Sequence, residues 1–125
     1  MKKLLFIDDD KGLIDMMRII FKRKSFEFYS AGIGEEGIEM AEKIEPDIII
    51  LDVCLPDMKG FEVCRRIKEG KKGKQVPVIF VTGQYFSEED RKKGSEVGAD
   101  DLFAKPFEPD KLLERISSVL KKDSS

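Results

Sequence analysis

Five polar side chains stand at the ends of short apolar runs, where buried strands would finish. They are Asp8, Asp9, Asp52, Thr82 and Lys105. Carboxylates, a hydroxyl and an ammonium, together with a divalent cation, are the groups that phosphoryl transfer onto an aspartate requires. The sequence contains no histidine and two cysteines, which excludes a Ser-His-Asp or Cys-His nucleophile, a histidine-ligated zinc site and a zinc site of four thiolates.

The three carboxylates of Asp8, Asp9 and Asp52 would repel one another in a shared site. At a separation of about 4 Å and an effective dielectric constant near 20, each pair costs about 4 kcal/mol. Protonation or a bound cation relieves this repulsion, and oxygen ligands at an open site suit Mg²⁺, or Mn²⁺ in its place. Asp10, by contrast, is predicted only to cap the helix that follows it.

The composition limits the partners and the compartment. The net charge is −2 and the isoelectric point is near 5.4, so no direct binding to nucleic acid or to an anionic membrane is expected. No apolar run approaches the roughly 18 residues of a membrane span, and the first residues do not resemble a signal peptide. Cys54 and Cys64 do not make a secreted disulfide framework, so a reducing, cytoplasmic location is expected.

Apolar periodicity predicts five strands that alternate with five helices. The strands are expected at 2–7, 26–30, 47–52, 76–81 and 101–105, and the helices at 11–24, 34–43, 60–68, 87–97 and 109–120. This pattern predicts one α/β domain over residues 1–125, a three-layer, doubly wound, flavodoxin-like sandwich on a parallel sheet. Residues 121–125 are expected to form a polar, frayed tail.

The order of the strands decides which side chains meet. The run 47–52 is apolar on both faces, as in a buried parallel strand, whereas 26–30 alternates and suits an edge. Right-handed crossovers then favour the order 2-1-3-4-5. Neighbouring strands lie about 4.8 Å apart, so the polar side chains at the carboxyl ends of four adjacent strands are expected to converge on one pocket.

The sequence closely resembles the receiver domain of bacterial two-component response regulators, the CheY-like superfamily. The resemblance extends from Leu4 to Leu120 and rests on motifs that are specific in combination. These are Asp8-Asp9, Asp52 with Pro56 and Gly60, Thr82-Gly83, Gly98-Ala99-Asp100 and Lys105-Pro106-Phe107.

The resemblance implies a phosphoacceptor rather than an enzyme acting on other molecules. Asp52 would accept a phosphoryl group from a histidine kinase or a phosphotransfer protein, and the domain would catalyse only its own phosphorylation and dephosphorylation. Thr82 and Lys105 would contact the phosphoryl group, and the Lys105-Pro106 bond would be cis.

The resemblance also implies the metal ligands. Asp9, Asp52 and the backbone carbonyl of Cys54 would bind Mg²⁺, with Asp8 acting mostly through water.

Phosphorylation in this family changes a protein-binding face built from the fourth helix, the fifth strand and the fifth helix. A downstream protein or an appended output domain would bind there, and the resemblance leaves open a homodimer that forms on phosphorylation. The predicted helix at 87–97 begins with a capping box at Ser87 and Asp90, has few apolar residues and contains Gly94. It is therefore expected to be the least stable helix, which suits a switching element.

Two departures from the family pattern affect the expected behaviour. Many members carry an aromatic residue three positions before the lysine, and Leu102 stands there. The neighbouring Phe103 is expected on the opposite face of the strand, because strand side chains alternate. Cys54 and Gln84 stand where the family adjusts access of the hydrolytic water, and the phosphoryl lifetime that they give is not predicted.

Residues 32–37 spell a literal G-x-G-x-x-G between a strand and a helix, the pattern of a dinucleotide-binding turn. The preceding strand is predicted at the edge of the sheet rather than its centre. Glu35 and Glu36 would also place negative charge where a pyrophosphate binds. The dinucleotide interpretation is therefore disfavoured.

Two other functions compete with the phosphoacceptor. A haloacid-dehalogenase phosphatase also phosphorylates an aspartate after a strand, but it would resemble this chain only with aspartate at position 54 and usually threonine at 56, where Cys54 and Pro56 stand. The remaining alternative is a degenerate receiver that binds proteins without phosphorylation. The complete set of polar residues argues against it.

Overall fold

The computed structural model describes residues 1–70, 75–83 and 87–124, the last three of them by their backbone only. Gln84, which the sequence places where the family adjusts access of the hydrolytic water, therefore lies outside the described residues.

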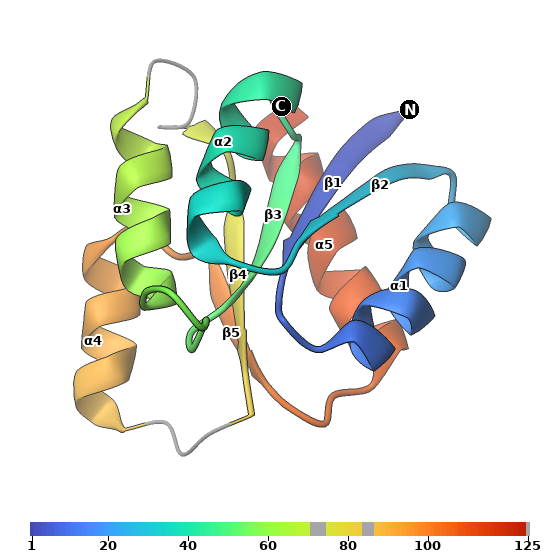
Figure 1. Ribbon diagram of the computed structural model, residues 1–125. Helices are drawn as coiled ribbons and strands as arrows, with labels where there is room; N and C mark the ends of the chain where they lie inside the picture. The colour runs from blue at the N-terminus through green and yellow to red at the C-terminus, as the bar shows by residue number, and fades with distance from the viewer. Residues whose placement is uncertain (71–74, 84–86, 125) are drawn as a thin grey trace.

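Five parallel strands form one sheet in the order β2-β1-β3-β4-β5, which confirms the predicted topology (Figure 1). They are β1 (Lys2–Ile7), β2 (Phe26–Ala31), β3 (Ile48–Asp52), β4 (Val78–Thr82) and β5 (Asp101–Ala104). Every residue of β3 and β4 is buried, because helices cover both faces of the central strands. A strand that is buried on both faces needs a continuous apolar run rather than an alternating one. β2 is half-buried at the edge.

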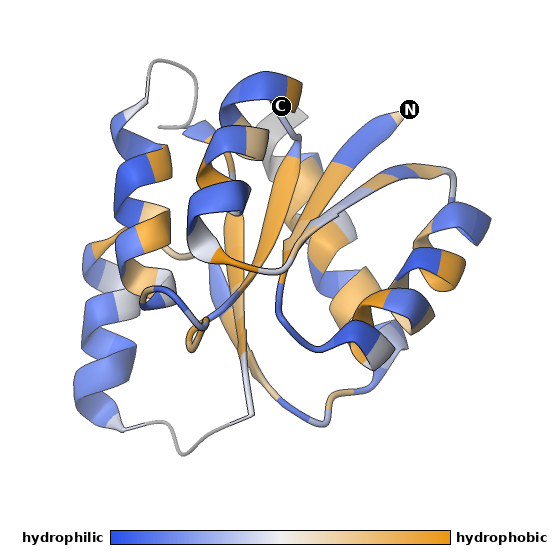
Figure 2. Ribbon diagram, in the orientation of Figure 1, coloured by the Kyte–Doolittle hydropathy of each residue, from blue (hydrophilic) through white to orange (hydrophobic). Residues whose placement is uncertain are grey.

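Helices cover the two faces of the sheet in unequal numbers. They are α1 (Lys11–Arg23), α2 (Gly34–Ile44), α3 (Gly60–Glu69), α4 (Glu88–Glu96) and α5 (Pro109–Ser124). Side chains of α1 and α5 pack with one apolar cluster, whereas α2 and α3 pack with the other, next to the residues that follow α4. The strands of the central layer are mostly apolar in Figure 2, as a sheet covered on both sides must be.

Alternation along the strands divides the core between the two faces. Leu5 and Ile7 of β1 belong to the cluster under α2 and α3, while Leu4 and Phe6 belong to the cluster under α1 and α5. Successive side chains of a strand point to opposite faces of the sheet, and in β1 both faces are buried.

α4 buries little of its surface against the rest of the domain. Gly94 is its only buried residue, and the rest of the helix is hydrophilic (Figure 2). The predicted capping box is present, because Ser87 accepts a hydrogen bond from the Asp90 N–H and Asp90 accepts one from Ser87. At the other end, the Cys64 thiol donates to the Val97 carbonyl at 3.4 Å.

Two predicted boundaries differ from the structure by two residues or more, and others differ by one residue. The fourth strand begins at Val78 rather than at position 76, because Pro77 has no N–H to donate, although its carbonyl accepts from the Ile49 N–H at 3.0 Å. The predicted tail is also helical, since α5 continues to Ser124. Lysine is a good helix former and a cation is favourable near the carboxyl end of the helix dipole, so Lys121 suits the extension of the helix.

Candidate functional site

The predicted polar residues lie together at the carboxyl edge of the sheet. Asp8 follows β1, Asp52 ends β3, Thr82 ends β4 and Lys105 follows β5. The strand ends are level, because Asp52 is paired with Val81 and Thr82 with Ala104. The parallel register therefore places residues that are far apart in the chain at one point.

Asp8, Asp9 and Asp52 form one acidic cluster, in which one carboxylate oxygen from each lies within 4.8 Å of the others. Asp8 is 2% exposed and Asp52 5% exposed, while Asp9 is exposed. The cluster thus has two buried carboxylates and one that reaches solvent, as an open cation site needs.

The ammonium of Lys105 lies between the two buried carboxylates. Its Nζ is 2.7 Å from Asp8 Oδ2 and 3.4 Å from Asp52 Oδ2. The contact with Asp8 is at ion-pair distance but outside hydrogen-bond geometry. The backbone fixes the start of this side chain, because the Lys105 N–H donates to the Thr82 carbonyl at 2.7 Å. The Lys105-Pro106 bond is cis, as the resemblance implied.

Backbone N–H groups hold the other oxygen of each buried carboxylate. Asp8 Oδ1 accepts from the Asp10 N–H at 2.9 Å, and Asp52 Oδ1 accepts from the Cys54 N–H at 3.1 Å. Asp10 caps α1, as predicted, by accepting from the Leu13 N–H. Both carboxylates are therefore oriented so that Oδ2 faces the centre of the site.

Burial and charge alter the acidity of the central pair. Burial, followed by the nearby charge of Asp8, raises the pKa of Asp52 above its ordinary value, although the Cys54 N–H and Lys105 act against this. Burial alone would lower the pKa of Lys105, but the carboxylates of Asp8 and Asp52 outweigh it and raise that pKa. Lys105 is therefore an ammonium at neutral pH.

The donors of this site fit a hard divalent cation. Three carboxylates and one ammonium carry a formal charge of −2, so Lys105 alone does not balance the formal negative charge of the cluster. All the side-chain ligands are oxygens, the preference of Mg²⁺ and Mn²⁺.

Asp52→Asn should stabilise the metal-free protein. Because folding raises the pKa of Asp52, ionisation costs the folded state stability as the pH rises above about 4, and asparagine removes this cost. In EDTA at pH 7 we expect the melting temperature to rise by about 2–4 °C. The gain should shrink as the pH falls toward 4.

Mg²⁺ provides the control for this prediction. At about ten times its dissociation constant, Mg²⁺ should stabilise the wild type by about 1.4 kcal/mol and Asp52→Asn by less. A variant that melts below the wild type in EDTA would contradict this electrostatic account.

A tight turn after β3 requires glycine at position 60. The Gly60 N–H donates to the Val53 carbonyl at 2.6 Å, and a Cβ on Gly60 would lie 2.3 Å from the Asp52 carbonyl oxygen. Within this turn, Cys54 and Lys59 form an isolated bridge. The turn therefore holds Cys54, the predicted carbonyl ligand, beside Asp52.

The G-x-G-x-x-G motif has a structural explanation. A Cβ on Gly34 would lie 2.6 Å from Met58 Cγ, and one on Gly37 would lie 2.6 Å from Ile7 Cδ1. These two glycines therefore permit close packing of α2. The amino end of α2 is already occupied by the Asp57 carboxylate, so no pyrophosphate can bind there.

Asp57 is the residue that the sequence analysis missed. Its Oδ1 accepts from the Gly34 N–H at 2.7 Å and its Oδ2 from the Glu35 N–H at 2.9 Å. These bonds, the one from Glu35 first, lower the pKa of Asp57. The only sequence signal was that Ile33, at the N-cap position, has no side chain able to cap α2.

The residues before Lys105 lie as predicted. Leu102 packs with the cluster under α2 and α3, and Phe103 packs with the cluster under α1 and α5. Phe103 therefore does not replace the aromatic residue that many family members carry at position 102.

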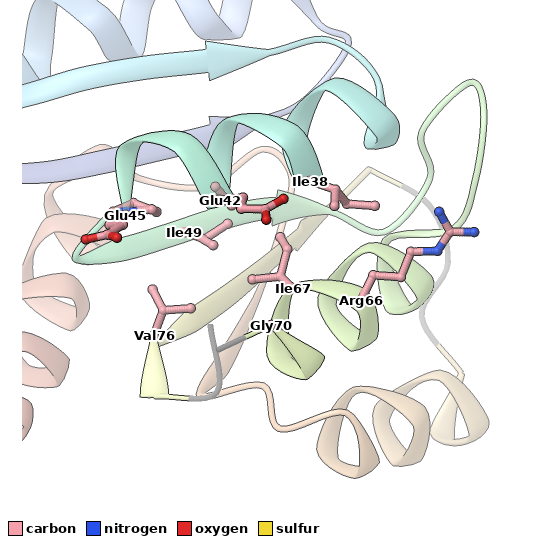
Figure 3. Close-up of a pocket in the computed structure, with 10 residues that line it drawn as sticks. Ile38, Glu42, Glu45, Ile49, Arg66, Ile67, Gly70 and Val76 are labelled. Carbon is pink, nitrogen blue, oxygen red and sulfur yellow. The ribbon is translucent and has the colours of Figure 1, made fainter. Parts of the chain in front are cut away.

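A separate cavity of about 520 Å³ lies between α2 and α3. Apolar side chains such as Ile49, Ile67 and Val76 line it, with Glu42 among the polar ones (Figure 3). None of the predicted site residues lines this cavity. The cavity and the acidic cluster are therefore separate features of the domain.

Comparisons with known proteins agree with the fold and the site. The family model of the response regulator receiver domain matches residues 4–117. The cell cycle response regulator CtrA of Brucella ovis is 36% identical over 120 residues, which cover 96% of this chain and 50% of that protein. The chain thus spans about half the length of this curated relative.

Solved structures show the same architecture. The chemotaxis protein CheY4 of Vibrio cholerae is 32% identical, with a TM-score of 0.89 over 95% of this chain and 98% of that one. A CheY-like receiver domain protein of Methanospirillum hungatei is 30% identical, with a TM-score of 0.93 over 99% of this chain and 97% of that one.

The parallel sheet with an acidic carboxyl edge defines the class, a CheY-like α/β domain. This chain belongs to the response regulator receiver domain family of two-component signalling. That membership removes the phosphatase and dinucleotide alternatives. Within the described residues, no helix is long and apolar enough to cross a membrane.

Proposed function

We propose that the domain is a phosphorylation switch in which Asp52 is the phosphoacceptor. One observation carries the proposal. Asp52 Oδ2 lies 3.4 Å from the Lys105 ammonium, beside the acidic cluster. A carboxylate oxygen of Asp52 attacks the phosphorus of a phosphohistidine on a histidine kinase or phosphotransfer protein. The P–O bond forms as the P–N bond breaks, and the donor histidine keeps the electron pair.

The neighbours of Asp52 stabilise the transferred group. Lys105 exchanges its carboxylate partners for a phosphoryl oxygen, and the Thr82 hydroxyl donates a hydrogen bond to another. Asp9, Asp52 and the Cys54 carbonyl would hold Mg²⁺ or Mn²⁺, with Asp8 acting through water. When bound, the cation would neutralise charge on the phosphoryl oxygens.

Phosphorylation by a small donor tests this proposal. The protein is incubated with Mg²⁺ and acetyl phosphate, and its intact mass is measured. We expect one phosphoryl adduct in the wild type, none in Asp52→Ala and none without Mg²⁺. Asp47→Ala is the matched control, because Asp47 lies at the opposite end of β3, and it should keep the adduct.

A wild type that gains no adduct from acetyl phosphate or from a natural kinase would support the alternative function, a phosphorylation-independent binding module. An adduct retained in Asp52→Ala would place the phosphoacceptor elsewhere.

The output surface in this proposal is the face formed by α4, β5 and α5. The weak attachment of α4, with Gly94 as its only buried residue, supports its role as the element that changes. A downstream protein, an output domain or a second phosphorylated copy would bind there. In the phosphorylated sample, amide hydrogen exchange of α4 should change relative to α3, and identical exchange in the two states would contradict the switch.

The proposed compartment is the cytoplasm. Cys64 is a buried thiol and Cys54 a partly exposed one, and cysteines kept as thiols are usual in a reducing compartment.

A further inference from the structure

The turn that follows β3 is tied to a helix more than twenty residues earlier in the chain. The Asp57 carboxylate receives the Gly34 and Glu35 N–H groups at 2.7 and 2.9 Å. Ile33, the N-cap residue of α2, makes no side-chain cap. Asp57 thus satisfies two of the first-turn amides that have no partner within the helix, and it does so from another segment.

Packing supports the same junction. The absence of a Cβ at Gly34 lets the first turn of α2 lie against Met58 and Val63, since a Cβ there would come within 2.6 and 2.8 Å of their side chains. Hydrogen bonds and close packing therefore both fix the turn against α2.

The turn passes this restraint on to the candidate metal site. Asp57 lies between Cys54 and Lys59, which form a bridge that closes the turn. At the base of the turn, the Gly60 N–H binds the Val53 carbonyl, and the Cys54 N–H binds Asp52 Oδ1. We expect a displacement of Asp57 to displace Cys54 as well, because these contacts restrain the short segment between them.

We propose that Asp57 is a positioning residue for the metal site: by clamping the turn to the amino end of α2, it aims the Cys54 carbonyl at the cation. This inference rests on the proposed function, in which that carbonyl is a metal ligand. Asp57 itself does not touch the cation. It acts as an outer partner that orients a ligand, a role whose loss typically weakens metal binding about 10–100-fold.

Cation affinity of the unphosphorylated protein provides the test, with Mg²⁺ measured by calorimetry and Mn²⁺ by electron paramagnetic resonance. We expect Asp57→Ala to raise both dissociation constants about 10-fold. Asp57→Asn keeps a carbonyl oxygen for one of the two amides, so its loss should be smaller. Amide hydrogen exchange at Gly34 and Glu35 shows in each variant whether the clamp has opened.

Asp47→Ala is the matched control. It also loses a hydrogen bond that a distant backbone N–H donates to a side chain, because Asp47 Oδ2 accepts from the Lys3 N–H at 2.7 Å. Asp47, however, lies at the far end of β3. The cation affinity of Asp47→Ala should equal that of the wild type.

Three outcomes would overturn the proposal. The first is faster exchange at Gly34 and Glu35 in Asp57→Ala with unchanged cation affinity, which would make the clamp a device of α2 stability alone. The second is an equal loss of affinity in Asp47→Ala. The third is a wild type that binds no cation. Because no phosphodonor is used, failure of Asp52 to accept a phosphoryl group is detected separately by the mass measurement.

Discussion

Lys105→Met should lower the free energy of unfolding by about 2–3 kcal/mol in EDTA. The Asp8 side chain is 0% exposed, and the Lys105 ammonium lies 2.7 Å from its Oδ2. Removal of one partner from a buried ion pair typically costs about 3–5 kcal/mol, because the remaining charge is left without compensation. Lys105 is 18% exposed, so water can reach part of the site and we expect a smaller value. Urea denaturation monitored by circular dichroism measures the change.

The double variant Asp8→Asn/Lys105→Met separates this electrostatic effect from lost packing. Asparagine removes the charge that the methionine variant leaves unpaired, so most of the lost stability should return. Saturating Mg²⁺ should likewise reduce the deficit of Lys105→Met. A deficit that stays the same with Asp8→Asn and with Mg²⁺ would mean that the aliphatic part of Lys105, rather than its charge, stabilises the fold.

Gly60→Ala should cost about 3 kcal/mol and weaken cation binding at the same time. The added Cβ would lie 2.3 Å from the Asp52 carbonyl oxygen and 2.9 Å from Val53 Cα. Both are backbone atoms, one from the last residue of the buried β3 and one from the residue that follows it. No side-chain rotation can therefore relieve the clash, and the turn must move. Overpacking of this kind typically costs about 1–3 kcal/mol, and the upper end applies where backbone must shift. Thermal unfolding and Mn²⁺ binding measure the two effects.

Gly32→Ala is the control for this substitution. A Cβ on Gly32 would meet nothing within 4 Å, and Gly98 is the glycine of the described chain with positive φ. Alanine at position 32 should therefore leave the protein unchanged or stabilise it by about 0.4–1 kcal/mol. An equal loss of stability in Gly32→Ala and Gly60→Ala would contradict this account. It would mean that chain entropy or helix contacts, rather than the clash with the Asp52 carbonyl, determine the loss.

The topology and most of the site could be predicted from the sequence, because a few local signals determine them. The apolar run that ends in Asp52 indicates a central parallel strand, and the alternation of Phe26 and Phe28 indicates an edge strand. The carboxyl ends of parallel strands meet at one edge, so the side chains that follow them had to converge. The capping residues Asp10 and Ser87 were predictable for the same reason, since each acts within its own helix.

Contacts between distant segments were not predictable. Nothing near Asp57 in the sequence indicates that it caps α2, because the amides that it binds lie on the other side of β3 in the chain. Gly34 was similarly ambiguous, since a glycine that allows close packing and one that binds phosphate look alike in a motif. Strand order predicts that Lys105 and Asp8 meet in one pocket, but it does not predict that the ammonium lies nearer to Asp8 than to Asp52.

The space around Gly94 would accept a residue that makes α4 more stable. A Cβ there would lie 3.8 Å from Phe61, 3.9 Å from Phe80 and 4.0 Å from Ala99, which are ordinary contact distances. The structure would therefore accept a methyl group, and alanine in a helix interior is about 1 kcal/mol more favourable than glycine. The chain keeps the less stable residue in the one helix that is proposed to rearrange. A helix that buries so little needs only a small input of free energy to move, and in the proposed switch the phosphoryl group supplies it.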